Sequence, residues 1–260
     1  MTQQDPSHIA TTIDQFTRQS AAFAALPIHS DAEAMALAFR CAGLSGEDHV
    51  LDVACGPGLV ACAAAATARH VDGIDLTPAM IASAQARQAE KGLSNLGWHT
   101  GNVAALPWPE DRFDLVLCRY AVHHFARPEQ VLAEMARVCR PGGRVMVIDA
   151  TPDEASATGF DEIERLRDPS HTHALPRATL MRMGCDLGLT RLDGASYELE
   201  VGLEDQLAAS ACEADAAQMI RERLTADARE GSDRHGFAAR CDDTGEVRMR
   251  YPISILVWRV

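Results

Sequence analysis

From about residue 47 to residue 150, segments with continuous apolar runs alternate with segments whose apolar residues have helical spacing. Short, almost continuous apolar runs predict buried β-strands at residues 50–54, 71–75, 96–101, 113–118 and 144–150. Stretches with helical spacing lie between most of them, at residues 59–68, 78–91 and 128–139. Because strands joined through helices pair in parallel, this order predicts a doubly wound α/β domain with a mostly parallel sheet.

The pattern is looser on both sides of this region. Two helices are predicted before it, at residues 9–25 and 31–43. The elements predicted after it are helices at 160–167, 177–187 and 204–229 and strands at 197–201 and 246–260. The segment 230–245 is rich in Gly, Asp and Arg and is predicted to be a loop.

The first predicted strand continues into a glycine turn, and the second ends at Asp75. This order is typical of the nucleoside-binding half of a doubly wound domain, in which an acid at a strand end binds the ribose hydroxyls. Gly56-x-Gly58-x-x-Ala61 also fits the dinucleotide motif, so an NAD(P)- or flavin-dependent oxidoreductase is one interpretation. Asp52, four residues before Gly56, would repel a pyrophosphate but attract a cation. The sulfonium and amino groups of S-adenosylmethionine suit that charge.

Charge and hydropathy restrict the partners. The chain of 260 residues has a formal net charge of −13 and no run of Lys or Arg. Nucleic acids and anionic membranes select basic surfaces, so we expect neither as a partner. No apolar run approaches the roughly 18–20 residues of a membrane span. Residues 1–20 lack the features of a signal peptide, and we expect a cytoplasmic location.

The lysine and cysteine content of the chain argues against several kinds of catalytic mechanism. Among 24 Lys and Arg residues only Lys91 is a lysine, which argues against Schiff-base chemistry and against a phosphate-binding P-loop. The eight cysteines form no Cys-x-x-Cys pair, and we interpret them as reduced thiols, mostly in the core. We predict no metal site from the spacing of potential ligands.

Six short motifs follow one another between residues 51 and 143. They are 51–58 (LDVACGPG), 73–80 (GIDLTPAM), 101–107 (GNVAALP), 113–119 (FDLVLCR), 121–125 (AVHHF) and 140–143 (RPGG). This series resembles the class I S-adenosylmethionine-dependent methyltransferases of the small-molecule type, and in particular the ubiquinone/menaquinone C-methyltransferase-like group. The resemblance covers residues 45–150 strongly and the N-terminal helices weakly.

The resemblance implies a set of cofactor-binding residues. Those expected at the methionine end are Asp52, Ala54, Gly56, Gly58, Cys118 and Arg119. It places Asp75 on the ribose and Leu76, Met80, Asn102 and Val103 around the adenine. Asn102 stands where the family usually has Asp, and its amide oxygen accepts the adenine hydrogen bond without assistance from charge.

Candidate residues for the chemistry and for the acceptor are less specific. His123 and His124 suit a general base for a hydroxyl or amine acceptor, or they simply pack the segment after the fourth strand. Candidate substrate contacts are Phe16, Phe23, His124, His171 and His173. Phe16 and Phe23 share one face of the first helix, which folds over the cofactor as a lid in related methyltransferases.

Together these observations predict a doubly wound, Rossmann-like sheet of seven strands, mostly parallel, with helices on both faces. The expected parts are a helical lid (1–45), a cofactor-binding core (46–150), a substrate-facing cap after the fifth strand (151–190) and a C-terminal completion of the sheet (191–260). The expected activity is in-line transfer of a methyl group from S-adenosylmethionine to C, O or N of a small aromatic or secondary metabolite. The alternatives are the oxidoreductase and a binder of S-adenosylmethionine that does not methylate.

Overall fold

A nine-stranded sheet organises the computed structural model, which describes residues 6–25 and 32–260 and the side chains of residues 7–18 and 32–260. Its strands are β1 (His49–Val53), β2 (His70–Asp75), β3 (Leu96–Thr100), β4 (Phe113–Arg119), β5 (Cys139–Ala150), β6 (Thr190–Arg191), β7 (Ala195–Gly202), β8 (Arg240–Cys241) and β9 (Val247–Arg259). The order across the sheet is β3-β2-β1-β4-β5-β9-β6, and β7 and β8 also pair with β9.

The predicted parallel core is confirmed. Strands β1 to β5 pair in parallel, and β9 is antiparallel to both β5 and β7. The described part of the chain has two strands more than the seven predicted, because β6 and β8 each add two residues along β9. A two-residue strand is too short to show an alternating pattern in the sequence.

The helices match most of the predicted segments. They are α1 (Pro6–Ala25), α2 (Ala32–Ala42), α3 (Leu59–Ala64), α4 (Pro78–Glu90), the 3₁₀ turn η2 (Val122–His124), α5 (Pro128–Val138), α6 (Ala157–Arg167), α7 (Arg177–Asp186), α8 (Leu203–Ala209) and α9 (Ala214–Glu230). The single helix predicted at 204–229 is divided into α8 and α9, because Ala211 adopts a left-handed φ of 50° that a helix cannot continue through. None of the described helices has both the length and the apolar character to cross a membrane.

Alternation along the strands separates the core into two layers. Val50 and Leu115 face one side of the sheet, where they join the apolar residues of α2 and α3. Leu51 and Val116 face the other side and join those of α5 and α7. Both sides of β1 and β4 are therefore buried, as continuous apolar runs predict.

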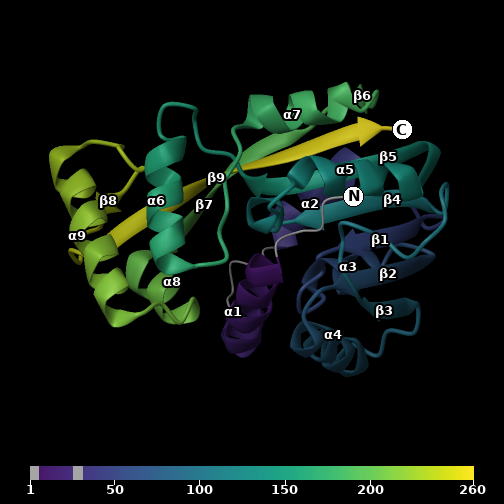
Figure 1. Cartoon of the computed structure of the whole chain (residues 1–260), viewed down its shortest axis with the longest axis horizontal. Coiled ribbons are helices and arrows are strands. Elements are labelled where there is room, and N and C mark those ends of the chain that lie inside the picture. Colours follow the sequence, from purple (N-terminus) through teal and green to yellow (C-terminus); the bar gives the residue numbers. More distant parts are fainter. Residues whose placement is uncertain (1–5, 26–31) are drawn as a thin grey trace.

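The remaining helices gather at one end of the long strand β9. Figure 1 shows α6, α8 and α9 around β7 and the first part of β9, away from β1, β2 and β3. Helix α1 lies between this group and the core, in contact with α4 and α8. Helix α2 instead packs on the sheet through Met35 and Ala38, so α1 is the N-terminal helix that approaches the carboxyl ends of the strands.

Candidate active site

A cavity of about 980 Å³ opens at the carboxyl ends of the parallel strands. Its walls are residues 54–57 after β1, 75–77 after β2, 102–103 after β3 and 119–121 after β4, with α1 on the open side. Ligands bind at this edge in doubly wound sheets. We call this space the first cavity.

The two glycines of the turn after β1 have different roles. Gly56 has φ 52°, and a Cβ added there would meet nothing within 4 Å, so its backbone faces open space in the first cavity. Gly58 is not on the cavity wall. A Cβ at Gly58 would lie 2.7 Å from the Trp98 ring and 2.9 Å from Cβ of Ala84, so this glycine permits α3 to pack closely on α4 and β3.

Asp75 is buried at the end of β2 and is held by the backbone of two turns. Its Oδ2 accepts a hydrogen bond from the Gly56 amide at 2.9 Å, and its Oδ1 accepts one from the Thr77 amide at 2.8 Å. Burial raises the pKa of Asp75 above its usual value, although these amide hydrogen bonds oppose the shift. A hydroxyl group in the cavity could donate a further hydrogen bond to this carboxylate.

Asp52 and Cys118, which the sequence places at the cofactor, are not on the cavity wall. Asp52 is 1% exposed, and burial raises the pKa of its carboxyl to about 8. Its Oδ2 has no hydrogen-bond partner among the described residues. Strand alternation directs Cys118 into the apolar layer beneath α5, and burial raises the pKa of its thiol.

The other predicted cofactor residues line the first cavity: Ala54, Leu76, Met80, Asn102, Val103 and Arg119. Ala54 has φ 55°, a strained value for a residue with a Cβ, which turns the chain away from β1. Asn102 Oδ1 accepts a hydrogen bond from the Ala104 amide at 2.9 Å, and this bond fixes the turn after β3. The guanidinium carbon of Arg119 lies 4.3 Å from the centroid of the Tyr120 ring.

A second cavity, of about 740 Å³, adjoins the first. Phe16, Tyr120 and His124 line both cavities and form their common wall. The rest of the second cavity is built by the end of β5, helices α6 and α8, residues 168–171 and strands β7 and β9. Two ligands could therefore meet at this wall.

His123 lines the second cavity and is bound to an acid at the end of β5. Its Nδ1 lies 2.6 Å from Oδ1 of Asp149, so Nδ1 donates the hydrogen bond and Nε2 keeps the lone pair. Burial by itself would lower the pKa of His123, but the charge of Asp149 and the hydrogen bond to it outweigh burial and raise the pKa. His123 is therefore a base of increased strength that is oriented by a carboxylate.

His124, the next residue, has the opposite environment. Burial lowers its pKa, and the neighbouring charge of His123 lowers it further. Ser170 Oγ donates to Asp168 at 2.6 Å and lies 3.1 Å from Nδ1 of His124, so the imidazole donates to the Ser170 hydroxyl. Phe16 packs edge-on against the His124 ring at 4.9 Å. His124 is a neutral wall residue and a weaker base than His123.

His171 and His173, in the segment after α6, lie in different surroundings. His171 is buried, lines the second cavity and has its ring 5.4 Å from that of His123. Its Nε2 donates to Asp161 Oδ1 at 2.7 Å. The His173 side chain is 70% exposed and binds Asp161 from the solvent side, away from both cavities. Phe23 lies in α1 beyond the side chains that the structure describes.

Sequence reasoning missed several polar residues of the second cavity, namely Asp149, Glu164, Arg167 and Tyr251. Arg167 binds the buried Glu164 through two bonds of 3.2 and 2.5 Å, and Tyr251 donates to Glu164 at 3.0 Å. Asp149 could have been predicted from the sequence, because it lies at the end of an apolar strand just as Asp75 does. The other three lie in segments without a motif, and only the fold brings them together.

The comparisons with known proteins agree with this architecture. Residues 51–147 match the family described as a methyltransferase domain. The uncharacterized methyltransferase YcgJ of Bacillus subtilis (strain 168) is 34% identical over 146 residues, which are 55% of this chain and 58% of that protein. The ubiquinone/menaquinone biosynthesis C-methyltransferase UbiE of Ruegeria sp. (strain TM1040) is 33% identical over 138 residues, which are 52% and 53% of the two chains. The chain thus spans little more than half the length of these curated relatives.

Solved structures extend the likeness to most of the described chain. The crystal structure of YcgJ from Bacillus subtilis superposes with a TM-score of 0.80 and 26% identity, covering 87% of this chain and 97% of that one. A putative methyltransferase from Bacillus halodurans C-125 gives a TM-score of 0.79 and 25% identity, with coverages of 88% and 99%. The fold is that of the class I S-adenosylmethionine-dependent methyltransferases. Residues 51–147 match the methyltransferase domain, and most of the chain shares the fold of these methyltransferases.

Proposed function

We propose that this chain transfers a methyl group from S-adenosylmethionine, bound in the first cavity, to a small-molecule acceptor bound in the second. The observation that carries the proposal is the common wall of Phe16, Tyr120 and His124, through which two ligands would lie next to each other. Methyl transfer depends mainly on alignment of donor and acceptor and on exclusion of water. Two adjoining, partly enclosed cavities suit that requirement.

The residues of the first cavity fit S-adenosylmethionine. Asp75 offers two oriented oxygens for the ribose hydroxyls, and Gly56 leaves room for a ligand against its backbone. Leu76, Met80 and Val103 provide an apolar surface for the adenine. When bound, S-adenosylmethionine supplies a methyl group activated by a sulfonium.

His123 is the base of this proposal. An acceptor ammonium would give a proton to Nε2 of His123 before its nitrogen attacks, and an acceptor hydroxyl would give its proton as the oxygen attacks. The new bond to the methyl carbon would replace the carbon–sulfur bond, with S-adenosylhomocysteine as the leaving group. Asp149 holds the imidazole in the required tautomer and stabilises its charged form. His124 stays neutral and shapes the wall between the ligands. A carbon acceptor with an acidic hydroxyl could use the same base.

The second cavity combines apolar and charged surfaces. Phe160, Leu199 and Ile253 are apolar, whereas His123 and the Glu164–Arg167 pair are polar. This lining favours a metabolite of modest size that has an apolar or aromatic body and at least one polar group. Helix α1 covers both cavities through Phe16 and serves as a lid, and α6 and the segment up to His171 serve as the cap.

The test is turnover of methyl-labelled S-adenosylmethionine with a panel of phenols, enols and amines. We expect label in an acceptor and formation of S-adenosylhomocysteine. A His123→Gln variant should lose about 10²–10⁴-fold in kcat, the usual contribution of a positioned base, with unchanged affinity for S-adenosylhomocysteine. The control His173→Gln alters a solvent-facing histidine of the same region and should keep full turnover.

Two other results would favour the alternatives. Thermal stabilisation by NAD(P) together with none by S-adenosylhomocysteine would support the oxidoreductase. Tight binding of S-adenosylhomocysteine without label transfer to any acceptor would support a binder that does not methylate. Equal turnover by His123→Gln and the wild-type chain would remove His123 from the mechanism.

A further inference from the structure

A cluster of histidines surrounds one carboxylate at the opposite edge of the sheet from the two cavities. His49 and His70 are the first residues of β1 and β2, and the parallel register places them side by side. Asp72 lies two residues further along β2, and His99 approaches from β3. We call these four residues the amino-edge cluster. Asp72 lies three residues, or about 10 Å of strand, before Asp75 of the first cavity, so the cluster is a separate site.

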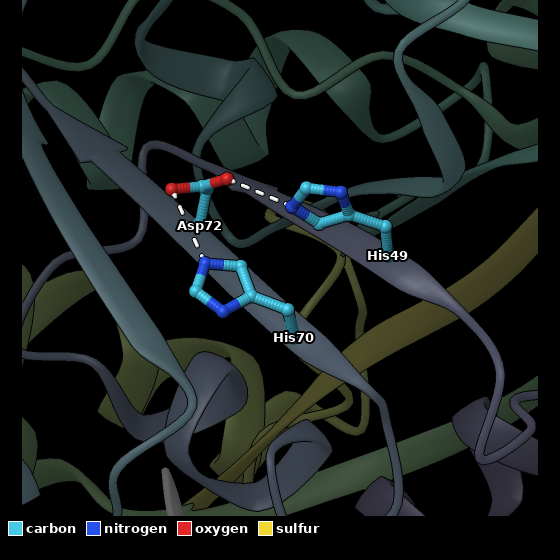
Figure 2. A group of neighbouring side chains, drawn as sticks. All are labelled: His49, His70 and Asp72. Carbon is cyan, nitrogen blue, oxygen red and sulfur yellow. Dashed lines mark hydrogen bonds and ion pairs between the residues drawn. The ribbon is translucent and has the colours of Figure 1, made fainter.

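The imidazoles of His49 and His70 both direct a ring nitrogen at Asp72, as Figure 2 shows. Nε2 of His49 lies 3.0 Å from Oδ2 of Asp72, and Nε2 of His70 lies 3.7 Å from Oδ1. One ligand atom from each of these three residues lies within 4.8 Å of the other two. Two imidazole nitrogens, each beside a different oxygen of one carboxylate, therefore lie close enough together to bind one ion.

His49 makes a hydrogen bond to Asp72, but the contact of His70 with Asp72 needs another explanation, and a bound metal ion supplies one. A distance of 3.7 Å from His70 to Asp72 is too long for a hydrogen bond. Ligand bonds of about 2.0–2.2 Å in a tetrahedral zinc site put neighbouring ligand atoms roughly 3.4 Å apart. The distances of 3.0 and 3.7 Å lie on either side of that value.

The surroundings of Asp72 are built to hold its carboxylate in this position. His99 Nε2 lies 2.9 Å from Oδ1 of Asp72, and the His99 ring packs edge-on against Trp108 at 4.8 Å. A Cβ on Gly97 would come within 2.5 Å of the same Oδ1, so only glycine leaves room for the carboxylate there. Hydrogen bonds of this kind from outside the ligand set orient metal-binding carboxylates. His70 is partly exposed, which gives an ion access from solvent.

We propose that His49, His70 and Asp72 bind a divalent transition metal ion, with Zn²⁺ the best match to a donor set of two imidazoles and a carboxylate. His99 orients Asp72, and water completes the coordination. The ion would join β1 to β2 at the edge remote from the cavities, so its effect is on the stability of the sheet. The proposal is independent of the proposed methyl transfer.

The test is calorimetric titration of the EDTA-treated full chain with ZnCl₂, together with the visible absorption of the Co²⁺ form. We expect one ion per chain with a Kd in the micromolar range or below, a higher Tm and a His70→Gln variant at least ten-fold weaker. His235→Gln is the matched control, because His235 also binds an aspartate, Asp227, at 2.7 Å but belongs to no such group. It should bind the ion as the wild-type chain does.

Three outcomes would overturn the proposal. They are no saturable binding to the wild-type chain, equal affinities of His70→Gln and His235→Gln, and loss of binding after alkylation of the exposed thiols of Cys185 and Cys241. His70 is chosen because its longer contact with Asp72 makes it the least needed for folding. Its replacement should also leave the affinity for S-adenosylhomocysteine unchanged.

Discussion

Nδ1 of His123 lies 2.6 Å from Oδ1 of Asp149, although 26 residues separate them in the chain. Asp149 closes β5, and two backbone amides fix its carboxylate: that of Val122 at 2.8 Å and that of Ala150 at 2.7 Å. The pair thus connects the 3₁₀ turn after β4 to the end of the neighbouring strand. It gives His123 both a fixed orientation and a raised pKa.

This pair predicts the pH dependence of methyl transfer. A base must be neutral to accept a proton, so kcat/KM should rise with pH through an inflection above 6.5, the usual pKa of histidine, because Asp149 raises the pKa of His123. In Asp149→Asn the inflection should move to lower pH, and kcat should fall by about ten-fold or more because the tautomer is no longer fixed. An identical pH–rate profile in the variant would show that the pair does not act in the reaction.

Asp75 is expected to control cofactor affinity. Hydrogen bonds to a charged group contribute about 1.5–3 kcal/mol, so Asp75→Ala should weaken S-adenosylhomocysteine binding by about ten-fold or more. Asp75 also holds the amides of Gly56 and Thr77, so thermal unfolding must show that the variant is folded. Asp186→Ala removes an exposed aspartate at the end of α7 and serves as the control. Equal affinity in the two variants would mean that Asp75 does not hold the ribose.

Asp52 should make the protein less stable as the pH rises. Burial raises the pKa of its carboxyl from 3.8 to about 8, so the folded chain binds a proton that the unfolded chain loses above about pH 4. The stabilisation is complete below the unfolded pKa and disappears as the pH rises through about 8. The Asn side chain does not titrate. Denaturant unfolding from pH 5 to 9 should therefore show Asp52→Asn gaining stability relative to the wild-type chain, and a constant difference would contradict this.

Gly58 is expected to be a packing residue. Gly58→Ala would place a methyl group against Trp98, whose Nε1 is tied to Gln88 at 2.6 Å, and against Ala84. Strain and overpacking together should cost about 2–4 kcal/mol of unfolding free energy. Gly92→Ala is the control, because Gly92 has φ 63° with nothing within 4 Å of an added Cβ, and it should cost only about 1–2 kcal/mol. Equal losses would show that the close approach does not matter.

Much of the lining of the first cavity follows from the sequence, because it is local. Asp75, Leu76 and Gly56 lie at strand ends, where a motif of a few residues fixes both the turn and the direction of the side chain. Cys118 is also predicted to line the cofactor site, but it lies within a strand. The alternation of side chains along that strand directs it into the core.

The acceptor half and the amino-edge cluster could not be predicted in the same way. His123 and His124 are adjacent in the sequence, yet Asp149 raises the pKa of the first, and burial lowers that of the second. Their partners come from β5 and from the segment around Ser170. The cluster of His49 and His70 likewise depends on the register between two strands. Such contacts depend on tertiary structure and leave no motif in the sequence.

The most direct test of the account is calorimetric titration of the purified chain with S-adenosylhomocysteine. We expect binding at one site with a Kd in the micromolar range or below, accompanied by a rise in Tm. A folded chain that shows neither heat nor a shift in Tm with S-adenosylhomocysteine, but is stabilised by NAD(P), would contradict the assignment of the first cavity.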